Sequence, residues 1–304
     1  MESTTPSGVW ALRIGGLSLL LHRRNWLMCG LLTLLLAVLA TLAISLGSGK
    51  MGLQDVIATL LGDGSKLHEI MVFKIRMPRV AAAIVAGLAM GMAGCLIQTL
   101  VRNRLATPDM IGVNEGASLA VVGFSLYLTL GSWPWWASPL GAVLAAVALF
   151  TLCRRPGEQG YLFIVIGIAL SELLGAIGDF AMSTQPLVHL GSLYLWTMGH
   201  FAGVSYQTVN PIAMVLLALC PLMALVNRPL ALLRFGDATA QNLGIRVPLV
   251  QLGVLGLAIL VASLGTAIGG PGTGAAGRDP HRHHDTATWR HPAAGIAAQG
   301  QTRS

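Results

Sequence analysis

Charged residues are scarce in this chain. Only 10% of its 304 residues are Asp, Glu, Lys or Arg, whereas about 25% is usual in a soluble domain. The hydrophobic fraction is correspondingly high, at 54%, and the mean hydropathy is +0.71. These values exclude an ordinary soluble domain and indicate a protein that lies largely in a membrane.

Acidic residues are the rarer of the two charge types. The chain has 12 Asp and Glu against 19 Lys and Arg, which gives a net charge of +7. A nucleic-acid-binding protein with such a charge presents a basic face on a soluble domain, and the sequence shows none. The charges of a membrane protein are informative through their position relative to the spans. We therefore expect membrane lipid around the chain and no nucleic-acid partner.

Cysteines are few, and catalytic motifs are missing. The cysteines lie in or at the edge of apolar runs and lack metal-ligand pairing, so we expect small core residues, no metal site and no cofactor. They are Cys29, Cys95, Cys153 and Cys220. A membrane-embedded hydrolase would need H-E-x-x-H or G-x-S-x-G on a span, and the sequence has neither. The chain is therefore predicted not to be an enzyme.

Long apolar runs dominate what is present. About 20 apolar residues cross a bilayer core as a helix, and about seven stretches are predicted to do so. They are residues 26–46, 80–100, 111–130, 137–152, 161–182, 209–226 and 248–268. Arg23 and Arg24 directly before the first run predict a cytoplasmic N-terminus. No cleavable signal peptide is expected, and residues 53–61 have the spacing of a short amphipathic helix.

The segment 76–117 carries the most specific motifs. It begins with R-M-P-R and continues through a span whose small residues recur at Ala83, Gly87 and Gly91, a spacing that lets another helix approach closely. R-N-R-L-A-T-P-D-M-I-G and G-V-N-E-G-A follow. The glycines of the last motif interrupt the start of the third span, and irregular backbone at membrane depth is tolerated only against protein or water. Asn114 and Glu115 are therefore candidates for a transport pathway.

These motifs, in this order, resemble the permease subunits of bacterial ABC importers for iron siderophores and vitamin B12. That family carries R-L-P-R, R-N-P-L-A-x-P-x-x-L-G and G-x-x-x-G-A at the corresponding places, and Arg104 stands where it usually has proline. The likeness covers residues 10–271. It implies an all-α, polytopic membrane fold of roughly ten membrane helices, of which about seven are expected here.

A cytoplasmic loop carries a further motif. F-G-D-A-T-A-Q-N-L-G-I-R-V, at 235–247, resembles the family's L-G-D-x-x-A-x-x-L-G-V, which implies short helices that seat in a groove of the ATP-hydrolysing subunit. From the residues alone, Asp237 is predicted to cap a helix over 238–243 that Gly244 ends. A generic surface turn would explain the caps, but not the whole pattern in this position. The expected ATPase-coupling residues are Phe235, Gly236, Asp237, Ala240, Leu243 and Gly244.

Lys74, Arg76 and Arg79 form a basic cluster on the side opposite the other arginines, at a predicted helix N-terminus where the helix dipole disfavours cations. One explanation is contact with lipid headgroups, because such side chains reach the interface readily. The other is docking. The resemblance implies that arginines here pair with glutamates of a soluble substrate-binding protein, and a guanidinium suits carboxylate recognition. Arg76 and Arg79 are the expected docking residues.

Glu172 and Asp179 are seven residues apart in the fifth span and share a helix face. Ionisable groups inside a membrane are costly and suggest a cavity or pathway, so Glu172 is a pathway candidate. An equal alternative places Asp179 at the interface and Glu172 protonated or hydrogen-bonded to a neighbouring helix. Further on, L-W-T-M-G-H-F-A-G resembles the family's W-x-x-G-S with His200 in place of serine, and we expect His200 to be a polar surface group.

The likeness stops near residue 271. Residues 271–304 contain no apolar stretch able to cross a bilayer, so relative to the roughly ten spans that the resemblance implies we expect about three to be missing. We expect a frameshift there, and a metal-binding tail is the alternative because His281, His283, His284 and His291 are clustered. The expected organisation is a cytoplasmic segment (1–25), an incomplete permease domain (26–270) and a disordered or frameshifted tail (271–304).

The resemblance implies a non-catalytic subunit of an importer in the bacterial cytoplasmic (inner) membrane. Chain-wide likeness is nearest to the catecholate, enterobactin-type siderophore permeases. Implied partners are ATP-binding-cassette ATPase subunits, a periplasmic or lipid-anchored siderophore-binding protein, and a second permease subunit, identical or different. A vitamin B12 or haem permease of the same architecture and an ion-coupled secondary transporter remain alternatives, the latter favoured by Glu172 and Asp179.

Overall fold

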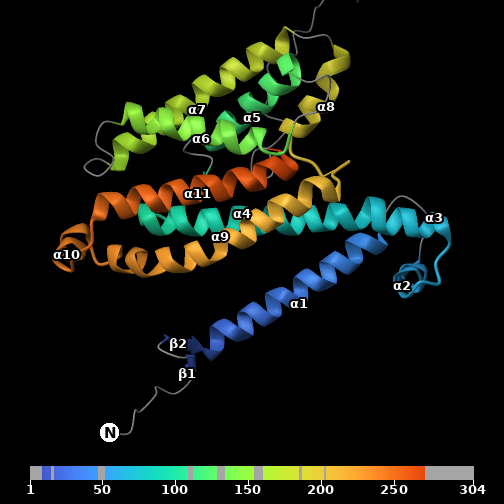
Figure 1. The fold of residues 1–304 in the computed structure, drawn as a ribbon, viewed down its shortest axis with the longest axis horizontal. Coiled ribbons are helices and arrows are strands. Elements are labelled where there is room, and N and C mark those ends of the chain that lie inside the picture. Colours follow the sequence, from blue (N-terminus) through green and yellow to red (C-terminus); the bar gives the residue numbers. More distant parts are fainter. Residues whose placement is uncertain are drawn as a thin grey trace, which may run out of the picture.

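The computed structural model describes residues 9–14, 17–46, 52–108, 112–128, 134–153, 160–184, 187–201 and 203–270. The predictions about the tail at 271–304 lie outside these residues. The described chain is a bundle of long helices that run roughly along one direction (Figure 1).

Each of the predicted spans coincides with helix, and the all-α polytopic membrane fold is confirmed. The helices are α1 (Arg23–Ser45), α4 (Met77–Val101), α5 (Val113–Gly123) with the π-helical turn η3 (Phe124–Leu128), α6 (Ala137–Leu152), α7 (Gly160–Ser183), α9 (Tyr206–Leu233) and α11 (Val247–Gly269). Among the described residues, 5 helical segments are long and apolar enough to cross a membrane, whereas α5–η3 and α6 are shorter apolar helices.

Smaller elements lie in the N-terminal segment and in the connections between the long helices. The amphipathic helix predicted over residues 53–61 is present as α2 (Leu53–Leu61). Two strands, β1 (Val9–Ile14) and β2 (Leu17–His22), form an antiparallel hairpin in the N-terminal segment (1–25), which the all-α expectation did not include. Two apolar runs separated by Gly-Gly are a hairpin signal. The helices α8 (Leu187–Thr197) and α10 (Asp237–Asn242) lie in the connections before and after α9.

The rod that contains α4 begins earlier than predicted. The short helix α3 (Lys66–Glu69) and the π-helical segment η1 (Ile70–Arg76) lead directly into α4, so 36 residues form one rod, Lys66–Val101. The Met77 amide donates to the Val72 carbonyl five residues back, a bond that carries the helix past Pro78. The basic cluster therefore lies inside a continuous helix and not at a helix N-terminus, which corrects the prediction.

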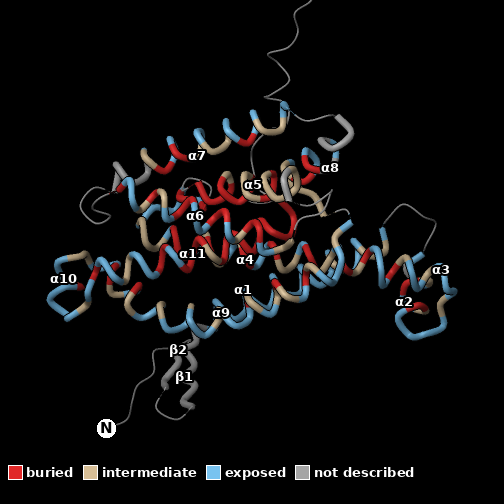
Figure 2. Tube along the Cα trace, turned by 45° about the horizontal axis from the view of Figure 1, so that its top comes forward, coloured by how far each residue is buried: buried red, intermediate tan, exposed pale blue. Residues whose placement is uncertain are grey.

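The core lies where α11 meets α4, α5 and α6. Buried residues are concentrated on these helices (Figure 2). In Figure 1, α5, α6 and α7 lie on one side of the α4–α11 pair, with α9 and α1 on the other. The α5–α6 crossing is close: a Cβ added to Gly116 would lie 2.4 Å from the Ala145 Cβ, and one added to Gly141 would lie 2.2 Å from the Gly116 carbonyl oxygen. Glycines at this crossing let the two backbones touch.

Candidate functional site

The loop helix α10 confirms the predicted helix to within a residue. Its N-cap is Gly236, with φ +108°, and Gly244 with φ +82° follows its end. The predicted cap was wrong: Gly236 makes no side-chain cap bond, and Asp237 is already the first helical residue. A glycine in this backbone region is easily accommodated, which leaves the Asp237 carboxylate available for another partner.

The other coupling candidates divide into buried and exposed groups. Ala240 is fully buried against the core cluster that also contains Leu233 and Val247, and it fixes α10 to the bundle. Phe235 and Leu243 stand at the two ends of α10 and are 73% and 60% exposed. Apolar side chains are therefore exposed at both ends of the loop helix.

Asp237 forms an ion pair with Arg102, through Oδ1 and Nη2. Arg102 is the C-cap of α4 and has a left-handed backbone, with φ +56° and ψ +28°. The pair joins two segments that are 135 residues apart in the chain. The sequence analysis missed it because neither residue signals its partner without the fold.

Arg76, at the opposite end of the rod, is not a free docking residue. It is only 8% exposed, and its Nη1 donates to the carbonyl oxygens of Ile44 (2.5 Å) and Ser45 (3.2 Å), while Nη2 donates to Met71 Sδ at 3.4 Å. The last carbonyls of a helix lack intrahelical donors, and a guanidinium can satisfy several at once. The structure thus gives Arg76 a packing role at the end of α1.

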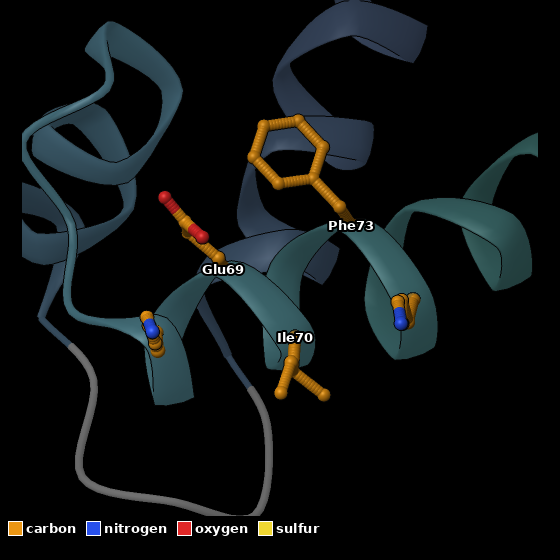
Figure 3. Close-up of a pocket in the computed structure, with 5 residues that line it drawn as sticks. Glu69, Ile70 and Phe73 are labelled. Carbon is orange, nitrogen blue, oxygen red and sulfur yellow. The ribbon is translucent and has the colours of Figure 1, made fainter.

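Exposed cations near Arg76 remain available. Arg79 and Lys74 are exposed on the same rod. A hollow of about 350 Å³ opens on its first turns, lined by Lys66, Glu69, Ile70, Phe73 and Lys74. Figure 3 shows Glu69 and Phe73 projecting from the same side of the helix. The hollow combines two cations and one carboxylate with an apolar lining, and it lies at the end of the bundle opposite α10 (Figure 1).

The three pathway candidates do not converge. Asn114 is 5% exposed, and its Oδ1 accepts a 3.0 Å hydrogen bond from Thr266 Oγ1 of α11. Glu115 faces α7, because a Cβ added to Gly175 would lie 3.5 Å from Glu115 Oε2. Glu172 lies on the exposed face of α7, as does Asp179. Of the three, only Glu172 faces away from the described bundle.

His200 and the cysteines depart from expectation. The His200 amide donates to the Gly269 carbonyl at 2.9 Å, and its ring Nδ1 is shielded and lacks a hydrogen-bond partner within the described chain. It is therefore half-buried at the end of α11 and not a surface group.

Cys153 is buried as predicted, but Cys29 and Cys95 are exposed on apolar helices. In the part of the chain that the structure describes, no group of His, Cys, Asp or Glu is arranged to hold a metal.

Apolar membrane-length helices around a close-packed centre, with a loop helix at one end, define a polytopic helical membrane protein. The chain belongs to the FecCD transport family, whose model matches residues 34–271. It is a membrane-spanning permease of the siderophore and vitamin B12 importer type.

Individual relatives differ in what their names say they transport. The chain is 32% identical over 241 residues to the achromobactin transport system permease protein CbrC of Dickeya dadantii, covering 78% of this chain and 69% of the relative. It is 29% identical over 274 residues to the ferric enterobactin permease FepG of Escherichia coli K12, covering 88% and 82%. The vitamin B12 permease BtuC of Escherichia coli O127:H6 is 31% identical over 234 residues, covering 74% and 67%.

A solved structure shares the fold. An inward-facing conformation of a metal-chelate type ABC transporter aligns with a TM-score of 0.67 at 21% identity, covering 81% of this chain and 76% of the other. At this identity the likeness establishes the architecture alone.

Proposed function

We propose that this chain is the permease subunit through which a ferric siderophore of the catecholate type crosses the bacterial cytoplasmic membrane in an ABC importer. The observation that carries the proposal is the family match over residues 34–271, which includes the described membrane helices from α4 to α11. Among the relatives reported, the ferric enterobactin permease is matched over the largest share of this chain, 88%.

The α10 end supports contact with an ATP-hydrolysing subunit. Phe235 and Leu243 are exposed apolar side chains on a loop rather than on a span, so lipid does not explain their exposure. Ala240 holds the helix between them against the core. We assign this end to the cytoplasm, where the ATPase subunits would bind it.

The opposite end supports docking of a soluble binding protein. Arg79, Lys74 and Lys66 are exposed there, and Arg76 is removed from the docking set by its burial. The end of α1 also lies here, because Arg76 binds the carbonyls of Ile44 and Ser45. The start of α1, with Arg23 and Arg24, then faces the cytoplasm, as the distribution of basic residues requires. Cations on the outer end would attract acidic residues of the loaded binding protein.

The exposed face of α7 supports a pathway shared with a second permease subunit. Glu172 and Asp179 are exposed there among apolar side chains such as Ile168, Leu173 and Phe180. A carboxylate facing lipid costs several kcal/mol, roughly 2.5–3.5 kcal/mol on insertion scales. Protein or water against this face would remove that cost. A second permease subunit, identical or different, would provide the protein contact and would enclose a water-filled pathway between the two subunits.

Uptake by reconstituted vesicles tests the proposal. Vesicles that contain the permease, its ATPase and the loaded binding protein should accumulate labelled iron from a ferric catecholate only when ATP is present. Cobalamin, ferric dicitrate and haem in parallel vesicles distinguish the substrates, and preferential cobalamin or haem uptake would overturn the siderophore assignment. Uptake that persists without the ATPase and follows an ion gradient would overturn the importer class and favour coupling through Glu172 and Asp179.

A further inference from the structure

The ion pair between Arg102 and Asp237 connects the loop helix α10 to the rod of α4. The two side chains are 44% and 41% exposed, so the pair lies at the surface of the bundle and outside its apolar core. Exposed ion pairs add little to folding stability. The pair joins residues that are 135 positions apart in the chain. Folding stability does not account for such a pair, whereas a role in connecting α10 to α4 would.

The backbone at Arg102 gives the first argument. Within the described ranges, Arg102 is the only residue other than glycine with positive φ. Its amide donates to the Gln98 carbonyl, and the Asn103 amide donates to the same oxygen at 3.1 Å, which ends α4 sharply. Glycine is the usual residue at such a helix end, since a Cβ makes this backbone costly. A long side chain kept at a costly position points to a use for that side chain.

The surroundings of α10 give the second argument. The helices that pack most against α10 are α9 and α11, its own neighbours in sequence. Its first residue carries the carboxylate, a position where the helix dipole favours negative charge, and Arg102 reaches that carboxylate from a different part of the fold. The ion pair is thus a direct attachment of α10 to α4.

The course of α4 gives the third argument. From Arg102 the rod runs back through Val101 to Lys66 without a break, and near its far end Arg76 binds the last carbonyls of α1. Along the way α4 packs against α11 and α9. A displacement passed to Arg102 therefore enters a continuous 36-residue rod whose far part contacts the end of α1.

We propose that Arg102 is a positioning residue that fixes α10 to α4 through Asp237. A movement imposed on α10 by the ATPase then passes directly into the rod and is not absorbed by the two turns that join α10 to α9 and α11. This inference rests on the proposed contact between α10 and the ATPase.

The ion pair itself is tested in the purified full chain by amide hydrogen exchange of residues 237–243. Arg102→Ala and Asp237→Asn should each raise the exchange rate about two- to fivefold, the range that an exposed ion pair supports. The double variant should be no faster than either single one, because both remove the same interaction. Arg102→Lys should stay near wild type, and high salt should mimic the loss. Arg104→Ala, at an exposed arginine two residues on, is the matched control.

Coupling is tested in the assembled importer. Arg102→Ala should retain the ATPase at the wild-type level but lower ATP-driven uptake roughly fivefold, the scale of a modest coupling free energy, and Arg102→Lys should restore it. Additive exchange effects, or unchanged exchange and uptake, overturn the positioning role while leaving the proposed function intact. Failure of the wild-type chain to retain any ATPase contradicts the proposed function and removes the positioning role with it.

Discussion

The Arg76 guanidinium binds the carbonyl oxygen of Ile44 at 2.5 Å and so ties the end of the π-helical segment η1, which leads into α4, to the end of α1. None of the residues of α1 is buried in the described chain. The helix that begins the membrane domain is therefore attached mainly at this one end, through a side chain that sequence reasoning had assigned to partner recognition.

Arg76→Ala should destabilise the attachment of α1. A hydrogen bond to a charged group contributes about 1.5–3 kcal/mol, and this substitution removes those to Ile44 and Ser45 together. We expect earlier thermal unfolding in detergent and faster proteolysis at the end of α1. Arg76→Lys should recover part of the loss, because an ammonium still donates to carbonyls. If the alanine variant is proteolysed at the wild-type rate, Arg76 does not hold the end of α1 in place.

Arg79→Glu should leave stability unchanged but weaken capture of the loaded binding protein. Arg79 is exposed, so its charge reversal disturbs no packing. Replacement of an attractive by a repulsive charge at an interface mainly lowers the association rate, and the effect shrinks at high salt. Surface plasmon resonance at two ionic strengths measures this. Arg246→Glu, an exposed arginine near α10, is the control, and equal losses in both variants would speak against a local docking surface.

Gly116→Ala should force α5 and α6 apart. The added Cβ would meet the Ala145 Cβ at 2.4 Å and the Gly141 carbonyl oxygen at 2.8 Å, and neither atom belongs to a flexible side chain. Overpacking of this kind costs about 1–3 kcal/mol. Gly123→Ala, on the same helix with nothing within 4 Å of its Cβ position, should be neutral or slightly stabilising. Unfolding midpoints in mixed detergent compare the two, and similar midpoints would disprove the close crossing.

Thr266→Val should lower stability by about 0.5–1.5 kcal/mol, the range for a hydrogen bond between membrane helices. The Thr266 side chain is fully buried, and its hydroxyl binds Asn114 at 3.0 Å. Asn114→Ala should have a similar effect, and the double variant should not be additive. If Asn114→Ala instead lowers uptake at unchanged stability, Asn114 lines the pathway as the sequence analysis expected.

Phe235→Asp and Leu243→Asp should each weaken retention of the ATPase subunit in co-purification, by roughly tenfold or more if these side chains are anchors of the contact. Both residues are already exposed, so the substitutions should not disturb folding. Leu105→Asp is the control, because Leu105 is 79% exposed in the α4–α5 connection but lies outside the loop helix. Undiminished retention in both variants would remove the coupling assignment.

The sequence predicted the helices better than the roles of single residues. The predicted spans at 137–152 and 161–182 agree with α6 and α7 to within a residue or two at each end, because a membrane helix needs a continuous apolar run of fixed length. The helix at α10 was found through its turn chemistry, although the cap was misassigned to Asp237. The hairpin of β1 and β2 was missed because its runs are short and precede the first span.

The sequence by itself determined that this is a helical membrane protein of the FecCD transport family, since hydrophobic length and motif order are written along the chain. Only the tertiary structure decided which basic residue binds the end of α1 and which is exposed. It also decided that Asp237 pairs with Arg102. Arg76 and Arg79 are three positions apart and chemically alike, yet one faces the end of α1 and the other faces outward. A side chain's role depends on which groups the fold brings within a few ångströms of it. Those groups come from distant parts of the chain, so the neighbouring residues in the sequence do not identify them.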